Sequence, residues 1–193
     1  MSKLAQKIDT LHKSGRTVFS TTQLALYWNT EHKRTLYVQI SRAKKKGFLK
    51  SIQKGLYAIN EVEVNRFELA GSLKKNSYIS FETVMAKESI INQWYGSYFS
   101  ASNRKMKIKN EYGTFEYKRL PERILNNRLG IINTGTYFIT TPERAVCDYV
   151  YKSGLQPLDD INELDLDELI RISKIYECKR LESDIKQLTK LML

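Results

Sequence analysis

The sequence has only two cysteines, two histidines and three prolines in 193 residues, and it contains no long apolar run. Cys147 and Cys178 lie far apart without a neighbouring histidine, which argues against a zinc site and against a disulfide framework. No segment approaches the ~18 apolar residues of a transmembrane helix, and the first residues lack the apolar stretch of a signal peptide. We therefore expect a cytoplasmic protein with reduced cysteines and no membrane partner.

Little in the sequence resembles catalytic machinery. Neither His12 nor His32 lies near a serine or cysteine in a nucleophile setting, and no glycine-rich phosphate loop occurs. Glu116-Tyr117-Lys118 is the one arrangement suited to a catalytic metal ion, because magnesium-dependent nucleases place a carboxylate two residues before a lysine on a strand. The only nearby acid is Glu111 in a turn, so we expect surface charges on an antiparallel hairpin. We expect neither an enzyme nor a cofactor or metal, with a metal-dependent nuclease as the enzymatic alternative.

The sequence is short of acidic residues, and the shortage is confined to its first third. Residues 1–60 hold twelve lysines and arginines against Asp9 and Glu31, a net charge of +10. Residues 61–193 hold 20 basic and 19 acidic residues, a net charge of +1. Such asymmetry is typical of a chain in which one module binds a polyanion. We therefore predict a DNA-binding domain at residues 1–60 and a second domain at residues 61–193.

The first sixty residues predict three helices followed by a hairpin. A first helix ends near Ser14-Gly15, a second follows the capping residues Ser20 and Thr21, and a third runs from Glu31 to Lys46. Residues 48–52 and 56–59 then form a hairpin around a glycine-containing turn. Three helices followed by a basic hairpin is the order of a winged helix-turn-helix.

The third predicted helix carries an unusual set of side chains opposite its apolar stripe, which consists of Leu36, Ile40 and Ala43. Arginine offers a bidentate donor to guanine, and an exposed valine suits the methyl group of thymine in the major groove. We therefore predict that this helix reads DNA bases through Arg34, Tyr37, Val38, Ser41, Arg42 and Lys45.

Other residues are suited to phosphate contacts, which position a protein on DNA without reading its sequence. The predicted phosphate contacts are Lys13, Arg16, Ser20, Thr21, Thr22, Lys44, Lys50 and Lys54. In the second domain, the candidates for a second basic patch are Lys105, Lys107, Lys109 and Lys118. The sequence leaves open whether this second patch contacts DNA.

Residues 61–193 predict an α+β domain with an antiparallel sheet and terminal helices. We expect Asn60 to begin a linking helix, Ser80 to cap a further helix, and strands at residues 95–101, 104–109, 114–120 and 137–140. Thr141-Pro142-Glu143 combines an N-cap, a first-turn proline and an acid, and Gly154 ends that helix.

The last predicted helix has an apolar stripe formed by Leu181, Ile185, Leu188 and Met192. The stripe is shorter than the three or four heptads that indicate a coiled coil. We therefore expect it to pack on its own domain, and we expect a monomer rather than an obligate dimer.

Four segments occur in a distinctive order and spacing over residues 15–155. They are Gly15–Thr22, Lys45–Ile59 with its Lys-Gly-Leu-Tyr sequence, Ser77–Glu82, and Thr141–Tyr149. In combination they resemble the AbiEi-type antitoxins, which are the antitoxin components of bacterial type IV toxin-antitoxin systems.

The resemblance implies an N-terminal winged helix that binds inverted repeats in double-stranded DNA and represses its own operon. It also implies a C-terminal domain that counters a nucleotidyltransferase-like toxin without forming a stable complex with it. Two alternatives remain open. One is an ordinary winged-helix transcription regulator whose second domain binds a ligand or partner, and the other is the metal-dependent nuclease.

Overall fold

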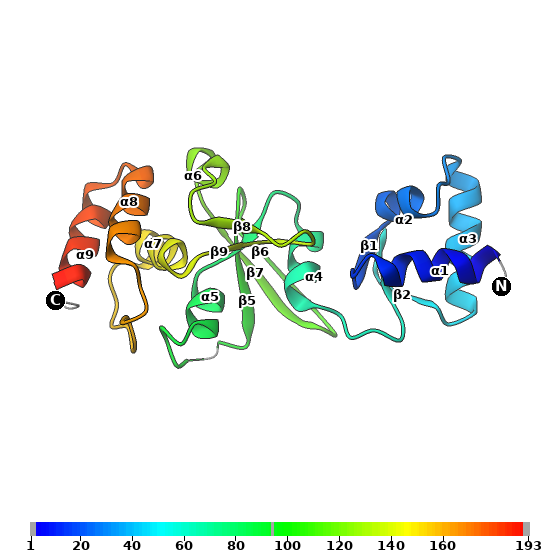
Figure 1. Ribbon diagram of the computed structural model, residues 1–193, viewed down its shortest axis with the longest axis horizontal. Helices are drawn as coiled ribbons and strands as arrows, with labels where there is room; N and C mark the ends of the chain where they lie inside the picture. The colour runs from blue at the N-terminus through cyan, green and yellow to red at the C-terminus, as the bar shows by residue number, and fades with distance from the viewer. Residues whose placement is uncertain (1–2, 94, 191–193) are drawn as a thin grey trace. The chain divides into compact units, whose positions relative to one another are not determined.

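The computed structural model describes residues 3–93 and 95–190 and has a mixed α+β fold (Figure 1). The chain forms two compact units, Met1–Leu73 and Lys74–Leu193, each with its own sheet. The first unit extends beyond residue 60, the predicted domain boundary, because helix α4 (Arg66–Leu73) packs against its strand β1 (Val18–Ser20). Within the described residues, no helix is both long enough and apolar enough to cross a membrane.

Three helices precede a hairpin in the first unit, in the predicted order. The helices are α1 (Lys3–Lys13), α2 (Thr21–Tyr27) and α3 (Lys33–Lys45), and strand β1 is followed by β2 (Leu49–Gln53) and β3 (Leu56–Ile59). Strand β3 lies between β1 and β2 and pairs with both in antiparallel register. Gly55 closes the β2–β3 turn with a φ of +78°, a conformation that glycine adopts without strain.

One apolar core joins the helices and the sheet of the first unit. Leu36, Ile40 and Ala43 form the buried stripe of α3, as their spacing predicts. They belong to the same cluster as Phe19 of β1 and Trp28, the residue that ends α2. Burial of this stripe determines which side of α3 remains in solvent.

The helix caps show where local sequence signals succeed and where they fail. Ser20 caps α2 in a capping box, as predicted. Asn60 does not begin the linking helix, because α4 starts later and the Asn65 side chain accepts hydrogen bonds from its first N–H groups. Ser80 is not a cap either, because its hydroxyl donates to the carboxylate of Asp148 at 2.7 Å. The Ser80 hydroxyl therefore bonds to a buried residue that is distant in the sequence, and it does not have the capping role that local spacing predicts.

A six-stranded sheet forms the centre of the second unit, with strand order β6-β7-β5-β4-β9-β8. The strands are β4 (Tyr78–Ile79), β5 (Ser97–Ser102), β6 (Met106–Asn110), β7 (Gly113–Arg119), β8 (Ile131–Asn133) and β9 (Phe138–Thr140). The prediction of an antiparallel sheet holds only in part, because β4–β5, β6–β7 and β8–β9 are antiparallel whereas β5–β7 and β4–β9 are parallel, so the sheet is mixed. The short turn between β6 and β7 indicates their hairpin pairing, whereas nothing in either strand indicates that the second neighbour of β7 is β5.

The helices of the second unit are α5 (Glu82–Lys87), α6 (Glu122–Asn126), α7 (Pro142–Ser153), α8 (Leu166–Ser173) and α9 (Lys179–Lys190), with a 3-10 turn at Lys174–Tyr176. Helix α7 begins and ends as predicted, with Thr141 as N-cap, Pro142 at the first position and Gly154 after the last turn.

The last helix packs within its own unit. Helix α9 contacts α7 and α8, and Figure 1 shows the three helices together near the C-terminus. Its apolar stripe is buried at Leu181, Ile185 and Leu188, which confirms that prediction for these three positions. Met192, the fourth residue of the predicted stripe, lies outside the described residues.

Candidate nucleic-acid interface

The side of α3 opposite its buried stripe is the strongest candidate site in the first unit. The side chains predicted to read bases are all exposed there, namely Arg34, Tyr37, Val38, Ser41, Arg42 and Lys45. Tyr37 is 54% exposed and Val38 is 43% exposed, although both have large apolar surfaces. Within the part of the chain that the structure describes, no hydrogen bond or ion pair engages the guanidinium of Arg34 or Arg42. Both arginines are therefore available to a ligand.

A hydrogen-bond network fixes α3 against α1 and the turn after α2. The Lys7 ammonium donates to the Trp28 carbonyl oxygen at 3.0 Å, to Thr30 Oγ1 at 3.1 Å and to Gln39 Oε1 at 2.7 Å. It also lies 5.6 Å from the centre of the Trp28 ring. Partial burial lowers the pKa of Lys7. The sequence does not reveal this network, because Lys7 and Gln39 resemble ordinary solvated residues at their positions.

Some of the predicted phosphate contacts are accessible. Thr22, Lys44 and Lys54 have exposed side chains, and Lys54 lies in the turn of the β2–β3 hairpin. Lys13 is exposed as well, and it forms a surface ion pair with Asp9 at 2.7 Å. An exposed pair of this kind exchanges readily for another partner, because it contributes little free energy.

The other predicted phosphate contacts are engaged in holding the first unit together. Arg16 is only 18% exposed and forms an ion pair of 3.2 Å with the buried Glu68 of α4. The Ser20 hydroxyl caps α2, and Thr21 Oγ1 donates to the Gly55 carbonyl at 3.2 Å. Lys50 is half-buried. We therefore assign structural roles to Arg16, Ser20 and Thr21 in place of the expected phosphate contacts.

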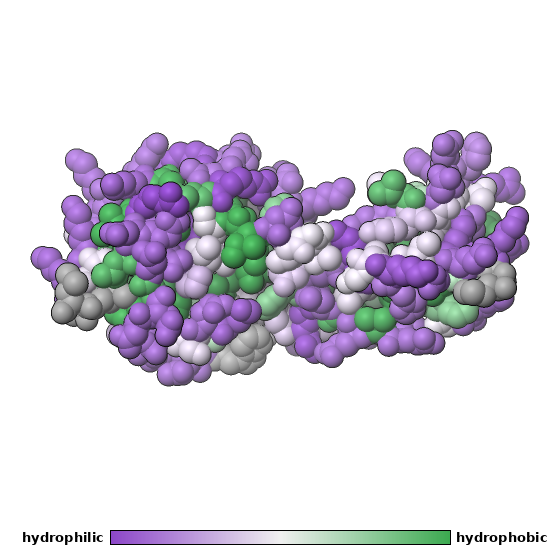
Figure 2. Space-filling model, viewed as in Figure 1, coloured by the Kyte–Doolittle hydropathy of each residue, from purple (hydrophilic) through white to green (hydrophobic). Residues whose placement is uncertain are grey.

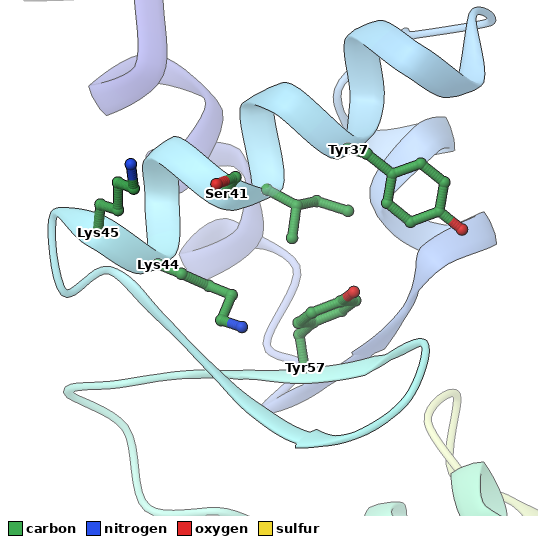
Figure 3. Close-up of a pocket in the computed structure, with 6 residues that line it drawn as sticks. Tyr37, Ser41, Lys44, Lys45 and Tyr57 are labelled. Carbon is green, nitrogen blue, oxygen red and sulfur yellow. The ribbon is translucent and has the colours of Figure 1, made fainter.

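A cleft of about 390 Å³ lies between α3 and β3 (Figure 3). It is lined by Tyr37, Ile40, Ser41, Lys44, Lys45 and Tyr57. In Figure 3 the Lys44 side chain points toward Tyr57, whereas the Lys45 side chain points away from it. Tyr57 was not predicted as a site residue, because the Lys-Gly-Leu-Tyr segment indicates only a strand that follows a turn.

The candidate basic patch of the second unit is reduced to three lysines. Lys105, Lys107 and Lys109 are exposed on or next to the edge strand β6. Lys118 does not join them, because its ammonium contacts both carboxylate oxygens of Glu82, one of them at 2.7 Å. It also lies 4.5 Å from the centre of the Phe99 ring.

Glu116 of the Glu-Tyr-Lys triplet is engaged in hydrogen bonds on the sheet. Its carboxylate pairs with Lys107 across the β6–β7 hairpin at 2.8 Å and accepts a hydrogen bond from Ser97 Oγ at 3.0 Å. The hydrogen bond from Lys107 lowers the pKa of Glu116. In residues 3–93 and 95–190, no three histidine, cysteine or acidic side chains are placed to hold a metal ion together.

Surface chemistry alone does not single out a partner. Figure 2 shows hydrophilic residues over most of the visible face of each unit, so polarity is general and not restricted to one site. What distinguishes α3 is the combination of unpaired arginines with exposed valine and tyrosine.

No protein-family model matches this chain, and a search of curated proteins also finds no match.

Proposed function

We propose that this protein is a DNA-binding antitoxin of a bacterial type IV toxin-antitoxin system. Its first unit acts as a winged helix-turn-helix that represses the protein's own operon, and its second unit counters a nucleotidyltransferase-like toxin. The observation that carries the DNA-binding role is the exposed side of α3, with Arg34, Val38 and Arg42 accessible and both arginines unpaired among the described residues. The antitoxin role rests on the four segments that resemble AbiEi-type antitoxins.

The order of elements in the first unit supports this assignment. Helices α2 and α3 are joined by a short turn, and α3 is followed directly by the β2–β3 hairpin. In a helix-turn-helix the second helix lies in the major groove, and this helix is α3. The hairpin then serves as the wing, with Lys54 exposed in its turn next to the DNA backbone.

The chemistry of α3 favours base reading over a purely electrostatic contact. A single exposed valine is common on protein surfaces. Here, however, Val38 lies one helical turn after Arg34 and one turn before Arg42, so three groups suited to base edges share one side of the helix. Their spacing fits consecutive contacts along the major groove.

The second unit has a different role in this proposal. Its charge is nearly balanced, since residues 74–193 carry a net charge of +3, against +8 over residues 1–73. We therefore assign operator binding to the first unit and protection from the toxin to the second, without a stable complex between antitoxin and toxin. The DNA partner in this proposal is a double-stranded operator with inverted repeats.

Coexpression with the adjacent reading frame tests the proposal. Combined Arg34→Ala and Arg42→Ala substitutions should abolish repression but preserve protection when the antitoxin is expressed from an unrelated promoter. Val146→Asp places a charge at a fully buried position of α7 and should remove protection. Growth is measured after toxin induction, with antitoxin levels matched by immunoblot.

The same experiment has two outcomes that contradict the proposal. Loss of protection by the arginine variants at equal abundance would show that antitoxicity depends on DNA binding. A protein that binds DNA and protects against no neighbouring gene product would be an ordinary transcription regulator.

A further inference from the structure

The cleft between α3 and β3 has the donor chemistry of an anion site. Two lysines, two tyrosines and a serine line it together with Ile40, and none of the lining residues is acidic. Among the described residues, neither Lys44 nor Lys45 forms a hydrogen bond or ion pair through its ammonium group. Residues 1–73, which form the first unit, carry a net charge of +8, so the cleft opens in a positive field.

Tyr57 presents a fixed donor at the floor of this cleft. Its backbone pairs with Phe19 of β1 and Ser51 of β2, and its side chain is only 8% exposed. Within the described part of the chain, its hydroxyl forms no hydrogen bond. Because the ring is held by the sheet and the core, a ligand that accepts this hydrogen bond meets a donor whose position is already set.

Tyr37 and Lys44 face the same cleft from α3. They are seven residues apart, which places them within about 20° of each other around the helix axis. Arg34, Val38 and Lys45 lie roughly 60–120° farther round, on the side that faces away from the core. Tyr37 and Lys44 therefore face the hairpin, and they do not lie at the centre of the side that reads bases.

We infer that this cleft binds one phosphate of the DNA backbone, with Lys44 supplying the positive charge and the Tyr37 and Tyr57 hydroxyls donating hydrogen bonds. The inference rests on the proposed DNA-binding function and refines it by moving Tyr37 from base reading to phosphate binding. Phosphate contacts fix the register and orientation of a protein on the duplex. A phosphate held between α3 and the hairpin sets the rotation of α3 in the groove, and thereby the bases that Arg34 and Arg42 reach.

Salt-dependent binding of a fluorescein-labelled duplex of mixed sequence tests the inference. Lys44→Gln should reduce the slope of log K against log salt by about 0.9, the value for one lost phosphate contact. Tyr57→Phe and Tyr37→Phe keep the rings and should weaken binding by about tenfold without changing this slope, because they remove a neutral donor to a charged acceptor. Lys186→Gln on α9 removes the same charge from an exposed position of the second unit and should change neither quantity.

Three results would overturn the inference in distinguishable ways. If Lys44→Gln and Lys186→Gln have the same affinity and the same salt slope while the wild type binds the duplex, the phosphate site is wrong. The proposed DNA binding is then unaffected. If the wild type binds no duplex, the proposed function fails together with the site. Calorimetric titration with inorganic phosphate alone is the third arm, and saturable binding that Lys44→Gln abolishes would assign the cleft to a small free anion.

Discussion

Asp148→Ala should destabilise the second unit far more than the loss of a surface charge. Asp148 lies on α7 and is fully buried. It accepts hydrogen bonds from Ser80 Oγ at 2.7 Å and from Tyr176 Oη at 2.6 Å, and its Oδ1 lies 3.5 Å from Arg144 Nε. Burial raises the pKa of Asp148, and the neighbouring Arg144 opposes that rise. The carboxylate therefore joins the residue after β4, helix α7 and the 3-10 turn after α8 through a single buried network.

The expected magnitude follows from what the substitution leaves behind. Arg144 is also fully buried, and its guanidinium donates to the carbonyl oxygens of Leu129 and Ile124, both at 2.8 Å. Without Asp148, no acidic side chain within the described residues forms an ion pair with this charge. Removal of one partner of a buried ion pair costs about 3–5 kcal/mol, a large share of the roughly 5–15 kcal/mol that stabilises a typical domain.

Urea unfolding of the full chain measures this loss of stability. Hydrogen exchange at the amides of α7 and β4 then assigns the loss to the second unit. Glu168→Ala is the matched control. It removes an acid that pairs with the exposed Arg171 within helix α8 of the same unit. The control should leave the free energy of unfolding nearly unchanged. If Asp148→Ala and Glu168→Ala lose similar amounts, the buried network does not stabilise the unit and the reasoning is refuted.

Three further predictions follow from the contacts of single residues. Lys107→Met should raise the pKa of Glu116 toward its usual value, and an unchanged carboxyl titration by NMR would exclude the ion pair. Because folding lowers this pKa, the pair stabilises the fold above the ordinary glutamate range and loses its contribution as pH falls. Gly130→Ala should lower the melting temperature more than Gly135→Ala. Both glycines have positive φ, but only at Gly130 does the new Cβ meet other atoms, the nearest at 2.8 Å. Glu68→Ala should accelerate amide exchange in α4, because it removes the acceptor of the Thr17 N–H and hydroxyl hydrogen bonds, and unchanged exchange would show that these bonds do not hold the helix.

Periodic sequence signals predicted the framework of the first unit well. The 3.6-residue spacing of Leu36, Ile40 and Ala43 fixes both the existence of α3 and the side that it buries. The side predicted to read bases is exposed for the same reason, since it lies opposite that stripe. A local signal was also sufficient at Thr141-Pro142, where a cap and a proline occur in adjacent positions.

Long-range partners are what the sequence does not reveal. Local spacing predicts that Ser80 caps a helix, yet its hydroxyl donates a hydrogen bond to Asp148, which is 68 positions away in the sequence. The sequence pattern around Lys118 predicts a solvent-exposed lysine, yet its ammonium pairs with Glu82 of α5. The parallel pairing of β5 with β7 likewise depends on which strands meet after folding, and alternation along either strand contains no information on that choice.

The most direct test of the DNA-binding account compares the affinity of α3 variants for two duplexes. One duplex carries the operator, located by footprinting upstream of the protein's own gene, and the other has a random sequence. Arg34→Ala and Arg42→Ala should each weaken operator binding by about 1–3 kcal/mol and relax the preference at specific bases, with a smaller loss on random DNA. Lys54→Ala should weaken binding to both duplexes equally, because it removes only a backbone contact. An equal loss on both duplexes for the two arginine variants would contradict the account and show that α3 does not read the operator.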